Sequence, residues 1–352
     1  MNNGEEMVDT TEIESQSPSI KGTNKAVLVI GGAGYIGSHT CKELRKNGYT
    51  PVVVDREVKN KIQSVLYGPS FELDLPKNIE TLDEIVKRYN IDSCIHFAAY
   101  TRVDESVSDP SKYYINNVLM TFRLIEKLRS LGVNTFVFSS SAAVYGTPDG
   151  GIGRDDEEKL LPINPYGRTK LMVEQILQDY HVAYGFNSVS LRYFNAAGSD
   201  VDGEIGENRK SPSHIIPRAI DAGKKVKEFR LFGTDFDTAD GTCVRDYVHV
   251  TDLARGHVLA LQKAHKEKIC ARYNLGSGTP TSNREVLTSV QRFTGAMNIK
   301  EEPRRAGDPA VLVADIARAV EELNWRPEHS DIDNIVRTAV QWYNKTNQKE
   351  IN

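Results

Sequence analysis

The chain is poor in cysteine and has no long apolar segment, and both absences exclude classes of protein. Its 352 residues include four cysteines, which lie far apart and form no C-x-x-C pair. This pattern fits reduced thiols, so we expect a cytoplasmic protein. No run approaches the roughly 18 apolar residues that a membrane-spanning helix needs. We therefore expect no membrane partner.

The chain also lacks an excess of positive charge. Its formal net charge is −4, and residues 1–24 alone carry five acidic residues against one lysine. The remaining residues are balanced, so nothing favours a nucleic-acid partner. Residues 1–24 are polar and have no apolar segment typical of a signal peptide, so we expect a disordered acidic extension.

Apolar runs alternate with helical segments from Lys25 onward. The strand candidates are residues 26–30, 50–55, 91–97, 134–139 and 187–193, and the helix candidates are residues 35–47, 78–90, 111–131 and 166–184. Continuous apolar runs indicate strands that are buried on both faces. Repeated β-α units imply a parallel sheet with right-handed crossovers. We predict an α/β protein with a Rossmann-type, doubly wound sheet.

A glycine-rich loop separates the first strand candidate from the first helix candidate. Gly31, Gly34 and Gly37 allow a tight turn, and the helix N-terminus offers N–H donors to a pyrophosphate. Asp55 ends the second strand candidate, 18 residues beyond Gly37. A carboxylate there can bind both ribose hydroxyls and should repel a 2′-phosphate. NAD is the predicted cofactor, although Arg56 leaves NADP as the alternative.

Ser141, Tyr166 and Lys170 are the candidate catalytic residues. Lys170 follows Tyr166 by four residues, so the two side chains share one face of the predicted helix. A positive charge beside the phenol favours phenolate, as would an oxidised nicotinamide. Such a tyrosine can take a proton from a hydroxyl group while a hydride leaves the same carbon. Together with the dinucleotide loop, the pair is a strong signal for this chemistry.

Seven motifs between about residues 25 and 325 resemble the UDP-glucose (UDP-galactose) 4-epimerases of the extended short-chain dehydrogenase/reductase family. These motifs are GGAGYIGSHT, HFAAY, FSSSAAVYG, NPYGRTKLMVEQIL, LRYFNAAGSDVDGEIGE, GTCVRDYVHVTDLA and PRRAGDPA. The resemblance implies that NAD oxidises the sugar at C4 and re-reduces it through a 4-keto intermediate, which interconverts UDP-glucose and UDP-galactose. It implies a UDP-sugar partner and no metal.

The resemblance also implies a role for individual residues. Tyr166 would be the catalytic base, Lys170 would hold the nicotinamide ribose and lower the pKa of Tyr166, and Ser141 would bind the sugar's 4-oxygen. The other residues matched to cofactor binding are Gly31, Gly34, Tyr35, Ile36, Gly37, Asp55, Asp74, Leu75, Phe97, Ala98, Ala99, Asn117 and Phe194. The other residues matched to substrate binding are Asn195, His214, Phe232, Arg245, Arg305, Asp308 and Leu312.

Three of these substrate assignments have structural alternatives. Arg245 could instead form an internal ion pair with Asp246, Arg305 could be solvated beside Arg304, and Phe232 could belong to the core. The chain also departs from common family residues. Thr101 stands where many members have lysine, Asp104 where many have glycine, and His214 where many have asparagine. The segment between Asp55 and Asp74 is shorter than usual.

Other functions remain alternatives. A 4,6-dehydratase needs an Asp-Glu pair after the catalytic serine or threonine, where this chain has Ala142-Ala143. An inactive NAD-sensing binding protein usually lacks the Tyr-Lys pair. A 4-epimerase of another UDP-sugar, carrying an N-acetylhexosamine, a pentose or a uronic acid, would share the catalytic core. Leu312 is shorter than the tyrosine of strict hexose epimerases, which predicts activity on N-acetylated sugars.

The sequence suggests a division into three parts. Residues 1–24 form the extension, residues 25–195 form the NAD-binding domain with parts of 240–280 returning to it, and residues 196–345 form mainly a smaller UDP-sugar-binding α/β lobe. Ser282 and Glu285 have the spacing of a capping box at the start of a helix. A homodimer is expected through the helices near residues 111–131 and 166–184, the second of which offers Leu171, Ile176, Leu177 and Tyr180.

Overall fold

The computed structural model describes residues 12–13, 25–156, 159–208, 214–305 and 308–348. Most of the predicted acidic extension, residues 1–24, lies outside the described residues. In the described part of the chain, no helix combines the length and the hydropathy needed to cross a membrane.

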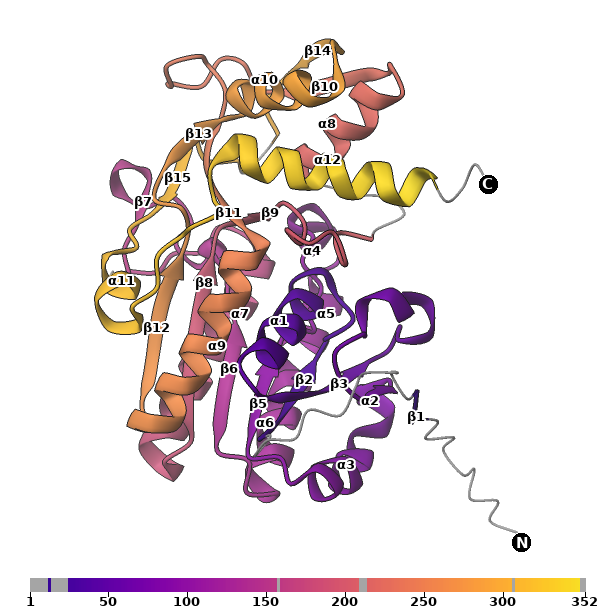
Figure 1. Cartoon of the computed structure of the whole chain (residues 1–352). Coiled ribbons are helices and arrows are strands. Elements are labelled where there is room, and N and C mark those ends of the chain that lie inside the picture. The colour runs from indigo at the N-terminus through magenta and orange to yellow at the C-terminus, as the bar shows by residue number, and fades with distance from the viewer. Residues whose placement is uncertain (1–11, 14–24, 157–158, 209–213, 306–307, 349–352) are drawn as a thin grey trace, which may run out of the picture.

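A large sheet forms the centre of the fold (Figure 1). Seven of its strands are parallel, and β1 pairs antiparallel with β4 at one edge. In spatial order the strands are β1 (Glu12–Ile13), β4 (Ser70–Glu72), β3 (Thr50–Asp55), β2 (Ala26–Ile30), β5 (Ser93–His96), β6 (Thr135–Ser139), β8 (Asn187–Tyr193) and β12 (Cys270–Leu275). The predicted Rossmann-type parallel sheet is confirmed.

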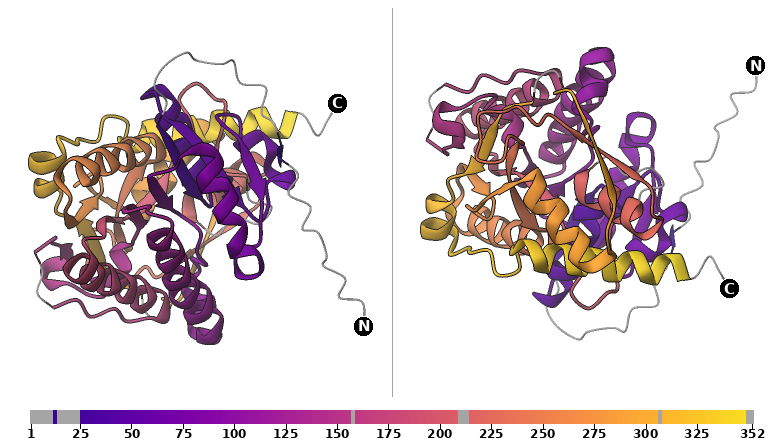
Figure 2. Two further views of the ribbon diagram at one scale, coloured as in Figure 1. Left: turned by 90° about the horizontal axis from the view of Figure 1, so that it is seen from below. Right: turned by 90° about the horizontal axis from the view of Figure 1, so that it is seen from above.

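Helices cover both faces of this sheet, as the end-on views of Figure 2 show. One face packs against α1 (Tyr35–Lys46), α9 (Val250–Glu267) and α11 (Ala317–Leu323), and the other against α3 (Leu82–Tyr89), α6 (Met120–Ser130) and α7 (Pro165–Tyr184). The central strand β2 is apolar and buried at all five residues, and β3 is buried at its four middle residues. Burial on both faces explains why β2 does not alternate between polar and apolar residues.

The predicted helix over residues 111–131 forms as three consecutive pieces. They are α5 (Pro110–Tyr113), a π-helical segment η3 (Tyr114–Leu119) and α6. The π-helical segment holds Asn117, whose side-chain amide exchanges two hydrogen bonds with the backbone of Tyr100, both 2.9 Å long. Wider turns of this kind inside helices often occur at functional sites.

The C-terminal half contributes a smaller lobe above the carboxyl ends of the large sheet (Figure 1). Its helices α8 (Ile215–Lys224), α10 (Asn283–Thr294) and α12 (Ile332–Gln348) share one apolar core. Its strands are β9 (Asn195–Ala197), β10 (Glu228–Phe232), β11 (Val244–His249), β13 (Pro280–Ser282), β14 (Asn298–Glu302) and β15 (Val311–Ala314), and β7 (Ile152–Gly153) pairs with β15. The capping box of Ser282 and Glu285 at the start of α10 is confirmed.

The remaining elements are short. They are α2 (Leu75–Asn78), α4 (Val103–Ser108) and the 3-10 turns η1 (Lys59–Ser64), η2 (Ile79–Thr81), η4 (Ala142–Val144) and η5 (Asp149–Gly151).

The residues of α7 that were expected to meet a second subunit pack within this chain, and only Leu177 of the four is fully buried. Leu177 is fully buried in the core, and Ile176 and Tyr180 pack against the same core. Leu171 packs against another apolar cluster, beside the serine-lined loop. These side chains face inward because α7 covers the large sheet.

Candidate active site

A large cavity lies between the carboxyl ends of the sheet and the lobe. Its volume is about 1450 Å³, and it extends from the glycine loop at Gly31 to Arg305 and Leu312 in the lobe. Pockets for one small ligand typically occupy about 300–1,000 Å³, so this cavity has room for two. Of the predicted site residues, all of which the structure describes, only Asn117 does not line it. Asn117 instead holds the backbone of Tyr100 from behind.

The glycine loop provides a cradle into which a side chain would not fit. Gly31 has a φ of +83°, and a Cβ there would lie 2.7 Å from the backbone nitrogen of Ala98. A Cβ on Gly37 would lie 2.4 Å from the carbonyl oxygen of Gly31. Helix α1 begins at Tyr35, directly after Gly34 and within this glycine-rich run, so its N-terminal N–H groups face the same space. This geometry fits the pyrophosphate of a dinucleotide.

Asp55 lies at the carboxyl end of β3, beside this cradle. Its Oδ2 accepts a hydrogen bond from the Ala33 N–H (3.1 Å) and its Oδ1 accepts one from the Glu57 N–H (3.0 Å). Burial raises the pKa of this carboxyl above its usual value, while the two N–H donors act in the opposite direction. These hydrogen bonds hold the carboxylate beside the cradle, where it is predicted to bind the hydroxyls of a ribose. Arg56 turns to the hydroxyl of Tyr100, 3.1 Å away.

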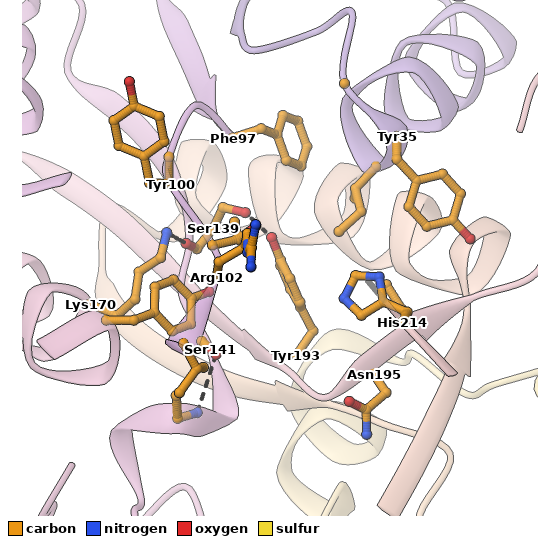
Figure 3. Close-up of a pocket in the computed structure, with 18 of the residues that line it drawn as sticks. Tyr35, Phe97, Tyr100, Arg102, Ser139, Ser141, Lys170, Tyr193, Asn195 and His214 are labelled. Atoms are coloured by element: carbon orange, nitrogen blue, oxygen red, sulfur yellow. Dashed lines mark hydrogen bonds between the residues drawn. The ribbon is translucent and has the colours of Figure 1, made fainter. Parts of the chain in front are cut away.

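Tyr166 and Lys170 occupy the first turns of α7. Asn164 caps this helix, because its side chain accepts the N–H of Gly167 at 2.8 Å. The ammonium of Lys170 donates to the carbonyl of Ser139 at 2.7 Å and lies 5.8 Å from the centroid of the Tyr166 ring. Tyr166 and Lys170 are both buried. In Figure 3, Lys170 and Ser141 lie near each other at one end of the cavity, with Asn195 and His214 at the other.

The pKa of Tyr166 shifts in the direction opposite to the expected one. Burial raises it, and the hydrogen bond with Ser141 only partly offsets this effect. Burial also lowers the pKa of Lys170 to about 7, against the attraction of Glu174. Desolvation disfavours the charged form of each group and is the largest cause of both shifts. An oxidised nicotinamide in the cavity would add a positive charge, which would act in the opposite direction and favour the phenolate.

Two polar contacts that the sequence analysis missed support the catalytic residues. Glu174 forms a fully buried ion pair with Arg192 and accepts the hydroxyl of Ser140. The hydroxyl of Tyr193 contacts Oγ of Ser139 inside the cavity. The sequence does offer one signal for the ion pair, because Glu174 follows Lys170 by one helical turn. Its partner Arg192 lies on β8, and nothing in the sequence connects that strand with this glutamate.

The lobe end of the cavity gathers the predicted substrate residues, which are Asn195, His214, Phe232, Arg245, Arg305, Asp308 and Leu312. Arg305 lies over the ring of Phe232, with 4.1 Å between the guanidinium carbon and the ring centroid. Arg245 Nη2 lies 3.8 Å from Asp308 Oδ1.

The structural alternatives for Arg245 and Phe232 are not what forms, whereas Arg305 is exposed, as its alternative has it. The carboxylate of Asp246 accepts backbone N–H groups from Ser277, Gly278 and Ala314, so it does not need the Arg245 charge. Phe232 is half-buried and lines the cavity. Arg304, not Arg305, pairs with a surface carboxylate, that of Asp235. Two guanidinium groups beside a flat aromatic ring suit a nucleoside diphosphate.

Known proteins resemble this chain over most of its length. Residues 27–276 match the model of the NAD dependent epimerase/dehydratase family. The UDP-glucose 4-epimerase of Rhizobium meliloti is 44% identical over 327 residues, covering 92% of this chain and 99% of that protein.

Solved structures agree with this match. UDP-glucose 4-epimerase from Brucella ovis in complex with NAD has a TM-score of 0.84 and 46% identity, covering 90% of this chain and 97% of that one. The UDP-Glc/GlcNAc 4-epimerase from Campylobacter jejuni has a TM-score of 0.77 and 35% identity, covering 92% of this chain and all of that one.

Proposed function

Because the chain belongs to the NAD dependent epimerase/dehydratase family, we propose that it interconverts UDP-glucose and UDP-galactose at the sugar's C4. One observation carries the proposal. The dinucleotide cradle, the buried Tyr166–Lys170 pair and the Arg245–Arg305 end line one continuous cavity. Cofactor and nucleotide sugar can therefore meet at the tyrosine hydroxyl.

Each end of the cavity has its own task. The glycine loop and Asp55 would hold NAD, which accepts a hydride from C4 and later returns it. Arg245 and Arg305 would bind the diphosphate, and Phe232 would pack against uracil. Charge-assisted contacts to a diphosphate are strong, so they anchor the nucleotide while the hexose is held more loosely. A loosely held hexose can turn and present its opposite face.

Tyr166 would move the proton. It takes the 4-hydroxyl proton as the hydride leaves C4, and it returns that proton when the hydride comes back to the 4-keto sugar. Ser141, whose hydroxyl bonds the phenol, would align the 4-oxygen with Tyr166. Lys170, fixed by the carbonyl of Ser139, would hold the nicotinamide ribose. The cycle is redox-neutral.

The test is conversion of UDP-galactose to UDP-glucose, followed by NMR of the anomeric proton without added NAD. The Tyr166→Phe variant should lose about 10²–10⁴-fold in turnover, since acid–base catalysis is removed. Its affinity for UDP, measured by calorimetry, should stay close to that of the wild type. The matched control is Tyr343→Phe, which removes a hydroxyl that bonds Asp221 in the lobe. Net consumption of NAD, or unchanged turnover in Tyr166→Phe, would contradict the proposal.

We also propose that N-acetylated sugars are accepted, that the protein works as a homodimer and that it acts in the cytoplasm. Leu312 lines the sugar end of the cavity, next to Arg245 in the pairing of β11 and β15. Ile115, Leu119 and Phe122 expose an apolar stripe along η3 and α6. The four cysteines are free, as in reducing compartments.

A further inference from the structure

Arg56 and Tyr100 stand on either side of the glycine loop. In the large sheet β2 lies between β3 and β5. Arg56 directly follows β3, the glycine loop follows β2, and Tyr100 lies four residues beyond β5. Parallel strands end at the same edge of a sheet, so Arg56 and Tyr100 flank the loop from opposite directions. Both residues line the cavity.

The two side chains meet across the loop. Nη1 of Arg56 donates a hydrogen bond to the hydroxyl of Tyr100 at 3.1 Å, and the guanidinium carbon lies 5.3 Å from the centroid of its ring. Neighbouring strands are about 4.8 Å apart, so β3 and β5, with β2 between them, are roughly two such spacings apart. The side chains of Arg56 and Tyr100 together bridge that distance. The hydrogen bond lies at the carboxyl edge of the sheet, where β2 ends and the glycine loop begins.

Tyr100 is the fixed side of this contact. Its backbone N–H and carbonyl both bond the side chain of Asn117, and Lys112 Nζ lies 4.4 Å from its ring centroid. Lys112 is itself held by Glu105 at 2.6 Å. Arg56 is exposed and reaches toward Tyr100 from the loop after β3.

We expect the adenosine end of the cofactor beside this contact, because Arg56 directly follows Asp55, the residue predicted to bind the ribose. The residues predicted to bind the cofactor there, which are Asp55, Asp74, Leu75, Ala98 and Ala99, all line the cavity. We propose that Arg56 and Tyr100 form a clasp that closes over the adenosine diphosphate half of NAD and slows its release. This inference rests on the proposed function.

A clasp has a clear use in a redox-neutral cycle. The hydride that leaves the sugar must return to the same sugar, so one cofactor molecule has to stay bound through both half-reactions. Arg56 also adds a positive charge to the cavity that holds the glycine loop, where it favours the negatively charged diphosphate of the cofactor. Losing a hydrogen bond to a charged group costs more than losing a neutral one. A variant that lacks the Arg56–Tyr100 hydrogen bond should therefore release NAD faster.

The experiment measures NAD retention, which does not depend on turnover. Protein purified without added NAD is incubated for timed intervals, passed through a spin filter and assayed for the NAD that remains bound. Tyr100→Phe removes the hydroxyl and keeps the ring, and Arg56→Gln removes the charge. Each should release NAD at least about tenfold faster than wild type, equivalent to about 1.4 kcal/mol. Tyr100→Phe should have no further effect in the Arg56→Gln background, because both changes break one bond.

Tyr343→Phe, whose hydroxyl bonds Asp221 outside the cavity, is the matched control and should retain NAD like the wild type. Wild-type release rates in both single variants, or effects that multiply in the double variant, would overturn the clasp. Wild-type protein that retains no NAD would instead overturn the proposed function. UDP binding by calorimetry should stay unchanged in every variant.

Discussion

Leu312 is the residue on which the width of the sugar pocket depends. It is half-buried on β15 and packs against the cluster that holds Tyr145 and Phe194. A tyrosine there would fill the space that an acetamido group needs, and overpacking costs about 1–3 kcal/mol. We expect measurable wild-type activity on UDP-N-acetylglucosamine, and Leu312→Tyr should reduce it at least about tenfold, or roughly 1.4 kcal/mol.

UDP-glucose turnover is the internal control for this variant and should be largely retained. Both activities can be read in the same NMR assay. A wild-type protein that turns over UDP-glucose but no N-acetylated sugar would mean that another side chain, such as His214, closes the pocket.

Asp155 should make the stability of the protein depend on pH. Its side chain is only 9% exposed, and burial raises its pKa to about 7. Among the described residues, its Oδ1 has no hydrogen-bond partner. Between about pH 4 and 7 the folded protein holds a proton that the unfolded chain has released, so the free energy of unfolding falls as pH rises.

Asp155→Asn mimics the protonated form and should remove this dependence. We expect a gain on the order of 1–3 kcal/mol at pH 8, the cost of an unsatisfied buried polar group, shrinking toward pH 4. Urea unfolding at both pH values measures it. A gain that is equal at pH 4 and pH 8 would argue against titration of this carboxyl.

Single residues also show what sequence can and cannot predict. Tyr166, Lys170 and Asp55 could be placed because their spacing from a strand or a helix start is fixed by geometry. The raised pKa of Tyr166 could not, since it depends on how much protein surrounds the phenol. The Glu174–Arg192 pair was missed because its partners come from a helix and a strand that only the fold brings together.

At the scale of elements, the start of α7 links helix stability to catalysis. Asn164 caps the helix two residues before Tyr166. Asn164→Ala should cost about 1 kcal/mol of stability, because the Gly167 N–H loses its acceptor. It should also lower turnover, because the first turn carries the catalytic tyrosine. Asn164→Asp retains an acceptor and should restore both properties.

Ser282→Ala provides the matched comparison, since Ser282 caps α10 in the lobe through the N–H of Glu285. It should lower the thermal midpoint by a similar amount and leave turnover unchanged. Equal losses of turnover in the two cap variants would show that overall stability, and not the position of Tyr166, is responsible.

The predictable elements were a long helix and an unbroken apolar strand. The helix over residues 166–184 is 20 residues long, and β2 is a continuous apolar run that ends at the glycine loop. The π-helical segment within residues 111–131 was not predictable, because one additional residue in a turn changes the apolar pattern of the sequence very little. Strands of two to six residues in the lobe carry too few side chains for a period to emerge.

At the scale of the whole molecule, an apolar stripe points to assembly. Ile115, Leu119 and Phe122 are 54%, 51% and 37% exposed and follow one another at helical spacing on η3 and α6. A contiguous exposed patch of this kind is typical of an interface. We expect a homodimer at micromolar concentration, and Leu119→Glu should weaken it by placing charge in an apolar contact.

Analytical ultracentrifugation measures the mass of both proteins. Val226→Glu is the control, since Val226 is 84% exposed in a loop of the lobe, and it should leave the dimer intact. A wild-type protein with a monomeric mass would reject the assembly, and a dimeric Leu119→Glu would place the interface elsewhere.

The position of β12 has a consequence for the synthesis of the chain. It completes the large sheet by pairing with β8, although the lobe strands β9, β10 and β11 are made in between. At about 5–20 residues per second, a ribosome needs roughly 4–16 s to pass from Tyr193 to Leu275. Throughout that interval the nascent chain presents the outer edge of β8 without its partner. An unpaired edge invites pairing with other chains, so this is the stage at which the growing protein most needs a chaperone.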